Sequence, residues 1–162
     1  MRWDDFARAC PRIADLARER FEADEVVMLG TLRADGSPRI SGNEPDFVDG
    51  HLFLGMMWES RKALDLRRDP RCTVHSVPHT RMNPGGDVKL SGTAYEVSDL
   101  DLRATYRDAI RRRIDWAPDE PGFHLFGIDV THAAAISFGE DRIALAWDER
   151  DGFRELRHPD EA

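Results

Sequence analysis

The segment from Ser60 to Pro70 combines residue types that can hold a phosphate group. It reads Ser-Arg-Lys-Ala-Leu-Asp-Leu-Arg-Arg-Asp-Pro and follows an apolar stretch that ends at Met57. If Ser60 caps a helix, the free N–H groups of the first turn point outward, and the positive end of the helix dipole adds to Arg61 and Lys62. A dianionic phosphate fits such a site. A capped surface helix with ordinary solvated cations explains the same residues, so this segment alone leaves both interpretations open.

The other residues that could do chemistry show no catalytic or metal-binding pattern. His75 and His79 have no partner at the spacing of a catalytic triad or a metal site, so we expect them to be satisfied or exposed histidines. The two cysteines, Cys10 and Cys72, do not form a zinc-type spacing with histidine. We therefore expect no metal and no acid or base catalyst, and the cysteine usage favours a reduced, cytoplasmic setting.

Composition predicts one soluble domain covering residues 1–162. The chain has 162 residues, of which 41% are hydrophobic and 33% charged, and its formal net charge is −8. This charge disfavours binding to nucleic acid or anionic membranes, and the run Arg111–Arg113 is most simply the solvated end of a helix. No apolar run approaches the roughly 20 residues of a membrane span.

Turn signals and alternating apolar residues predict a mainly β fold with a few helices. Asp35-Gly36 and Asp49-Gly50 are typical of tight hairpin turns. The predicted strands cover residues 26–33, 38–43, 44–48, 51–56, 71–77, 88–97, 123–130, 133–138 and 142–147. The predicted helices cover residues 11–22, 61–68 and 99–113, with Asp99 as the cap of the last one. A loop is expected at residues 83–86, and the tail 148–162 is polar and of uncertain order. These elements favour a small antiparallel barrel.

The order of elements and the residues of the motifs resemble those of the pyridoxamine 5′-phosphate oxidase-like family of FMN-binding split barrels. The resemblance covers roughly residues 24–148 and is most specific in the Ser60–Pro70 segment. This segment is similar to the family's Ser-Arg-Lys-Ala run and later Asn-Pro, where the Arg and Lys hold the phosphate of FMN. The resemblance implies a mainly β (α+β) fold, an antiparallel split β-barrel with flanking helices.

The same resemblance implies a set of cofactor-binding residues. Arg39 falls at the spacing of a second phosphate-binding arginine, and Met56 and Met57 fall where the chain approaches the flavin. Trp58 falls where the family often has an aromatic residue, which would either wall the flavin edge or pack at a dimer seam. The implied cofactor-binding residues are Arg39, Met56, Met57, Trp58, Ser60, Arg61, Lys62 and Lys89.

The chain also departs from the vitamin B6 oxidases of this family. Glu44 stands where they carry a Lys, and Asp87 stands where they carry a flavin-contacting Gln. The C-terminal stretch that grips pyridoxal phosphate in the oxidases has no convincing counterpart. We therefore do not expect oxidation of pyridoxamine 5′-phosphate, and an acidic substrate side would suit a neutral or cationic substrate better.

The resemblance implies an FMN-dependent oxidoreductase of unknown small-molecule substrate, with the cofactor at the interface of a homodimer. Because the flavin carries its own redox chemistry, no catalytic side chain is required. A reductase that uses the deazaflavin coenzyme F-420 would need the same cations and remains an alternative. A non-catalytic flavin- or haem-binding protein and a cofactor-free dimer are further alternatives, so enzyme activity stays an open expectation.

Overall fold

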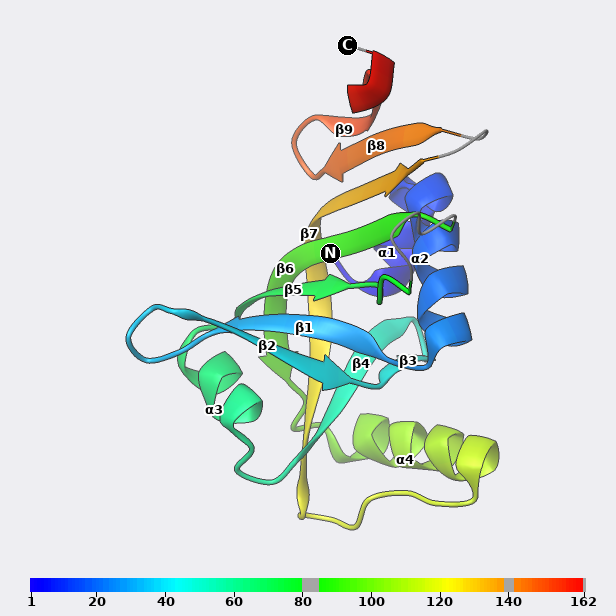
Figure 1. Cartoon of the computed structure of the whole chain (residues 1–162). Helices are drawn as coiled ribbons and strands as arrows, with labels where there is room; N and C mark the ends of the chain where they lie inside the picture. Colours follow the sequence, from blue (N-terminus) through cyan, green and yellow to red (C-terminus); the bar gives the residue numbers. More distant parts are fainter. Residues whose placement is uncertain (80–84, 139–141, 162) are drawn as a thin grey trace.

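A computed structural model describes residues 1–79, 85–138 and 142–161 of the chain. One antiparallel sheet of nine strands curls into a split barrel, and four α-helices flank it (Figure 1). The strands are β1 (Val27–Leu32), β2 (Pro38–Asn43), β3 (Pro45–Val48), β4 (His51–Met57), β5 (Arg71–His75), β6 (Asp87–Glu96), β7 (Phe123–Ser137), β8 (Ile143–Asp148) and β9 (Gly152–Glu155). The helices are α1 (Trp3–Ala9), α2 (Pro11–Asp24), α3 (Arg61–Arg68) and α4 (Leu100–Ile114), and a short 3-10 turn covers Pro159–Glu161. The fold expected from the resemblance is thus confirmed.

The strand order explains where the barrel is split. Neighbouring strands follow the order β2-β1-β5-β6-β7-β4-β3, with β8 beside β7 and β9 beside β8. Strands β2 and β4 therefore form no ladder with each other, although the side-chain amide of Asn43 donates to the carbonyl of Gly55 at 3.1 Å. In Figure 1, α3 lies beside the β1–β2 hairpin, and α1 and α2 lie together along another side of the sheet.

The predicted hairpins form where the Asp-Gly signals indicated. Gly36 and Gly50 adopt φ values of 81° and 76°, the left-handed conformation that glycine tolerates without strain. The β1–β2 ladder runs from Val27 opposite Asn43 to Leu32 opposite Pro38. Strand β2 contacts α3 through two of its residues, because Lys62 donates to the carbonyl of Gly42 and Arg39 pairs with Asp65.

The two strands predicted at residues 123–130 and 133–138 are one continuous strand, so that prediction is wrong. Strand β7 pairs with β4 at its start, with β6 along most of its length and with β8 at its end. A bulge in the β6–β7 ladder accommodates the polar residue Thr131, because the register shifts between Ser91 and Gly92. At Gly92 an added Cβ would lie 1.9 Å from the carbonyl oxygen of Asp129, so the close approach of the two strands requires glycine.

Both ends of the described chain are more ordered than the sequence suggested. The polar N-terminal segment forms α1, whose Trp3 and Phe6 are buried between acidic residues that face solvent. The tail forms β9 and then returns to the barrel, where His158 Nε2 lies 3.0 Å from the carbonyl oxygen of Ser137. The apolar positions of these ends are too few for a periodic signal, so only tertiary packing fixes their structure.

Two clusters of buried side chains make up the core. The main cluster fills the barrel and joins it to α1 and α2, and Trp147 belongs to it. The second cluster lies under α4 and holds this helix against β4 and β7; its members are Phe53, Val97, Tyr106, Ile110, Phe123 and Leu125. Each such side chain contributes roughly 1.5 to 3 kcal/mol when fully buried. Within the described ranges, the protein has no helix that is both long and apolar enough to cross a membrane. Of the loop predicted at 83–86, residues 83 and 84 lie outside the described residues.

Candidate functional site

A tight turn leads from β4 into α3 and presents the N-terminus of this helix. The N–H group of Ser60 donates to the carbonyl of Met57 at 3.1 Å, and Glu59 takes a left-handed φ of 57°. Ser60 occupies the N-cap position, but its side chain makes no capping hydrogen bond, which corrects the expectation of a serine cap. Its Oγ is instead buried and has no hydrogen-bond partner among the described residues. The N–H groups of the first turn therefore remain without a side-chain acceptor.

The two cations behind Ser60 differ in their surroundings. Arg61 is exposed and forms no hydrogen bond or ion pair with another described residue. Lys62 donates from Nζ to the carbonyl oxygen of Gly42 at 2.7 Å, which brings the first turn of α3 against β2. Burial lowers the pKa of Lys62, and the negative charge of Glu44 partly offsets this shift. One cation is thus free to meet a ligand, and the other is already positioned by the backbone.

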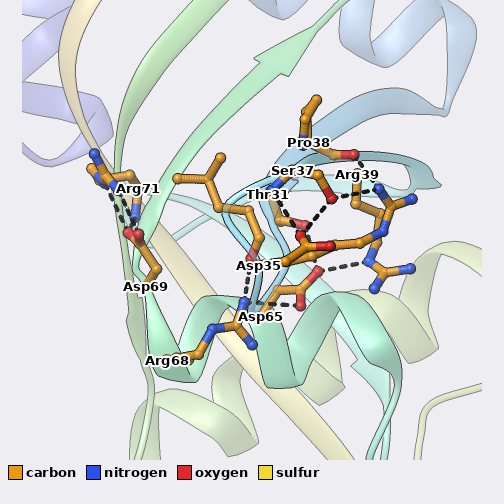
Figure 2. A network of polar contacts seen from close by, with 11 residues as sticks. Thr31, Asp35, Ser37, Pro38, Arg39, Asp65, Arg68, Asp69 and Arg71 are labelled. Carbon is orange, nitrogen blue, oxygen red and sulfur yellow. Dashed lines mark hydrogen bonds and ion pairs between the residues drawn. The ribbon is translucent and has the colours of Figure 1, made fainter.

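Arg39, on β2, contacts the same helix through the buried carboxylate of Asp65. Its Nε donates to Oδ2 of Asp65 at 2.6 Å, and Thr31 Oγ1 donates to the same oxygen at 3.0 Å (Figure 2). Arg68 Nη2 donates to the other carboxylate oxygen at 3.1 Å. Although burial opposes the charge, the hydrogen bonds from Arg39, Arg68 and Thr31 hold the pKa of Asp65 below its ordinary value. The terminal nitrogens of Arg39 bind no other described residue.

We call Arg39, Ser60, Arg61 and Lys62 the anion site. The structure brings these four sequence-predicted residues to the start of α3 and the neighbouring part of β2. Sequence reasoning missed Asp65, which holds Arg39 there. The signal was present, because Asp65 lies between Ala63 and Leu66 on the buried face of the helix, where a carboxylate needs a cationic partner.

Three further predicted residues lie at the end of β4, next to the anion site. Met56 is 4% exposed and belongs to the main core, so its backbone is what it offers to a ligand. Met57 and Trp58 are 78% and 54% exposed. The indole of Trp58 stacks on the buried ring of His124, with 4.5 Å between the ring centroids. An exposed aromatic face is therefore fixed beside the helix N-terminus.

Lys89 is the one predicted residue that a single chain keeps apart from the others. It lies on β6 in a row that runs through His75 and Met28 to Gly42 on β2. Three strand spacings of about 4.8 Å separate the ends of this row, roughly 14 Å along the sheet. Lys89 lines a different cavity, of about 250 Å³, together with Asp87. The structure thus does not bring Glu44 and Asp87 to one place within a chain.

A cavity of about 480 Å³ lies between β4, α4 and the connection at residues 115–122, and the end of β4 links its lining to the turn before the anion site. We call it the β4–α4 cavity. Met56 and Met57 line it, and so do three residues that form an ionic group around the buried carboxylate of Asp46. In this group, Asp46 accepts a hydrogen bond from Tyr106 at 3.2 Å and pairs with Arg113 at 2.7 Å. Arg113 therefore belongs to this ionic group and is not only the end of a solvated basic run. The only sign of the pair in the sequence was the charged residue Asp46 inside the short strand β3.

The charges of this ionic group are strongly influenced by burial. Asp46 is 3% exposed, and burial raises its pKa, while Arg113 and Tyr106 act in the opposite direction. Burial, together with the neighbouring Asp46, raises the pKa of Tyr106. The described part of the chain contains no cluster of three or more His, Cys, Asp or Glu side chains placed to hold a metal ion. What the arrangement offers is an anion site beside an apolar cavity, which suits a phosphate-bearing ring system and a second small molecule.

The family model described as pyridoxamine 5′-phosphate oxidase matches residues 13–137. This range contains all residues of the anion site and the ionic group of Asp46, Tyr106 and Arg113. No curated protein matches the chain by sequence.

Several solved structures share the fold at low sequence identity. A pyridoxamine 5′-phosphate oxidase-related, FMN-binding protein from Nostoc punctiforme superposes with a TM-score of 0.63 and 19% identity, over 94% of this chain and 95% of that one. A heme-binding protein from Mycobacterium smegmatis gives a TM-score of 0.64 and 21% identity, and the match spans 83% of this chain but only 57% of the other. A Clostridium acetobutylicum protein related to general stress protein 26, of the pyridoxinephosphate oxidase family, gives 0.62 and 17%, over 82% and 92%.

Proposed function

The chain belongs to the pyridoxamine 5′-phosphate oxidase family, and we propose that it is an FMN-dependent oxidoreductase of a small molecule. In this proposal the anion site holds the phosphate of FMN, and Met57 and Trp58 lie along the isoalloxazine ring. The chain acts as a single domain in the reducing cytoplasm.

One observation carries the proposal: the Oγ of Ser60 is buried at the N-terminus of α3 without a partner among the described residues. A buried hydroxyl without a hydrogen bond costs about 1 to 3 kcal/mol, so a ligand that accepts its hydrogen bond is favoured there. In this proposal the first-turn N–H groups, the free guanidinium of Arg61 and the positioned Arg39 all donate to the same phosphate. These residues fit a phosphate dianion.

The chain's own residues would bind and orient the cofactor, which supplies hydride transfer when bound. Arg61 and the terminal nitrogens of Arg39 are the charge-assisted donors, and the Asp65 carboxylate fixes the direction of the second. The Trp58 indole, held flat by its stack on His124, presents an apolar face that excludes water from one side of the site. No described side chain is required to move a proton.

We also propose that the functional unit is a homodimer. Lys89 can join the anion site only across two chains, because the sheet separates them within one chain. The face of the sheet formed by β1, β5 and β6 carries small residues such as Gly30, Thr73 and Ser91 along a shallow groove of about 500 Å³. A flat surface of this kind suits close packing of a second copy and closure of the cofactor site.

The deazaflavin coenzyme F-420 is the alternative cofactor, because its acidic tail would need the same three cations. Absorption spectra of the purified protein after incubation with FMN, with F-420 or with haem separate the alternatives. We expect a stoichiometric flavin spectrum with FMN and reduction of that flavin by a nicotinamide or another donor. A saturating deazaflavin or haem spectrum with no retained FMN would overturn the assignment. Turnover of pyridoxamine 5′-phosphate at a micromolar Michaelis constant would contradict the expected exclusion of that substrate.

A further inference from the structure

We propose that the β4–α4 cavity is the substrate pocket and that it takes a flat apolar compound bearing a cationic amino group, which Glu44 recognises. The proposal rests on the proposed function in one respect: the cavity must lie beside the bound flavin. Its charge and shape are independent of that function.

The cavity opens next to the anion site. Met56 and Met57, at the end of β4, belong to its lining and lead directly into the turn before Ser60. Glu44 lines the cavity and is close enough to Lys62 for its charge to influence the pKa of that lysine. A compound in the cavity would therefore lie against a ring held by the anion site. A volume of about 480 Å³ accommodates a small aromatic compound.

The walls of the cavity are mainly apolar. Met57, Ile110, Trp116 and Phe123 contribute to the lining, and Trp116 is 60% exposed. Gly55 forms part of the floor, where an added Cβ would lie 2.4 Å from Oη of Tyr106. The glycine thus allows Tyr106 to approach β4 and donate to Asp46. The shape of the floor depends on this contact.

The charges that line the cavity favour a cationic ligand. Arg113 and Tyr106 compensate Asp46, and Asp119 is fully exposed beside Arg107 at 4.0 Å. Glu44 is exposed and forms no ion pair with another described residue. Lys62 is the nearby cation, but its ammonium group donates to the carbonyl of Gly42. When a phosphate dianion compensates Lys62, the carboxylate of Glu44 is left without a counter-charge at the mouth of the cavity.

The connection at residues 115–122, which forms the outer wall of the cavity, is held in place before any ligand binds. Arg103, 8% exposed, forms two hydrogen bonds with Glu120, at 2.8 and 2.9 Å, and donates to the carbonyl of Phe123 at 3.0 Å. Arg107 Nε donates to the carbonyl of Pro118 at 2.7 Å. These bonds tie the connection at residues 115–122 to α4. A preformed pocket loses little entropy on binding, so its charge decides between ligands of equal size.

The test compares two probes of the same shape and opposite charge, 2-phenylethylamine and 3-phenylpropionate. Each is titrated into the FMN-loaded protein by calorimetry, while the indole N–H signal of Trp116 reports binding in the cavity. We expect the amine to bind at least about fivefold more tightly than the carboxylate. Glu44→Gln should abolish this preference without weakening FMN binding, because it removes a negative charge near Lys62. Glu19→Gln, which neutralises an exposed acid on α2, is the matched control and should preserve the preference.

Equal or tighter binding of the carboxylate, an unchanged preference in Glu44→Gln, or no binding of either probe at Trp116 overturns the inference. If FMN itself fails to bind, the proposed function fails, and the same titration of the cofactor-free protein then decides on the pocket alone.

Discussion

Arg39 donates from Nε to Oδ2 of Asp65 across 2.6 Å, which joins β2 to the buried face of α3 (Figure 2). The carboxylate is only 4% exposed, yet it stays ionised because Thr31 and Arg68 also donate to it. Arg39 is therefore an oriented cation, and its terminal nitrogens have no partner among the described residues. In the proposed function, Asp65 acts on the cofactor only through Arg39.

Asp65→Asn is expected to destabilise the fold by about 1.5 to 3 kcal/mol near neutral pH, because it weakens hydrogen bonds to charged partners. The folded-state pKa of Asp65 lies below its ordinary value of 3.8, so its stabilising effect is complete above that value and is lost as the pH falls through the lower, folded-state value. Urea unfolding between about pH 6 and pH 2.5 should therefore show a steeper acid loss in the wild type than in Asp65→Asn. Asp101→Asn, an exposed control, should keep the wild-type slope. Parallel pH profiles for the wild type and Asp65→Asn would contradict this role.

The Ser60→Ala variant distinguishes between two roles of the Ser60 hydroxyl, ligand binding and helix capping. Because the Ser60 side chain makes no capping bond and its hydroxyl is buried without a partner among the described residues, we expect the free energy of unfolding without cofactor to stay unchanged or to rise by up to about 1 to 3 kcal/mol. Asp99 accepts hydrogen bonds from Asp101 N and Leu102 N at 2.9 and 3.0 Å, so Asp99→Ala should cost about 1 kcal/mol. FMN affinity should fall in Ser60→Ala and not in Asp99→Ala. An equal loss of stability in both variants would show that Ser60 is only a cap.

Cys72 is expected to be inert toward thiol reagents in the folded protein. It lies on β5, 7% exposed, and burial raises its pKa to about 12, so almost no thiolate exists near about pH 8. Burial also raises the pKa of Cys10. Reaction with a chromogenic disulfide should be slow for both thiols until denaturant is added, whereas Ser98→Cys, at an exposed position, should react at once. Fast labelling of the native wild type would show that the sheet opens readily.

The hairpins and the capped α4 could be predicted because local sequence determines them, whereas the residues of the anion site were expected from the family resemblance as well. Asp35-Gly36 and Asp49-Gly50 select tight turns, and Asp99 is a strong cap signal. The continuity of β7 could not be predicted, because the polar residue Thr131 indicates the end of a strand. In the structure a bulge opposite Gly92 accommodates Thr131, and the strand continues. Asp65 and the Asp46–Arg113 pair depend on contacts between residues far apart in sequence, which periodicity does not encode. The same holds for α1, which is too short to be stable without the packing of Trp3 and Phe6.

The proposed homodimer predicts a mass of about twice the 18.5 kDa of one chain in light scattering. Thr73→Glu places a charge in the centre of the β1–β5–β6 face, where Thr73 Oγ1 lies 2.9 Å from Ser91 Oγ. This variant should become monomeric and lose FMN affinity together, because both depend on the second chain. Ser98→Glu, outside that face, should do neither. A wild-type monomer that binds FMN at full stoichiometry contradicts the shared site.

The comparison of FMN with riboflavin tests the central claim most directly, because the two differ only in the phosphate. Titration of the cofactor-free protein should give an FMN affinity at least about a hundredfold higher than that for riboflavin, since charge-assisted donors are each worth roughly 1.5 to 3 kcal/mol. Arg61→Ala should weaken FMN about ten- to a hundredfold and leave riboflavin unchanged, whereas Arg112→Ala, on the exposed end of α4, should change neither. Equal affinity for both compounds in the wild type, or an Arg61→Ala variant that binds FMN as the wild type does, would show that the start of α3 is not the phosphate site.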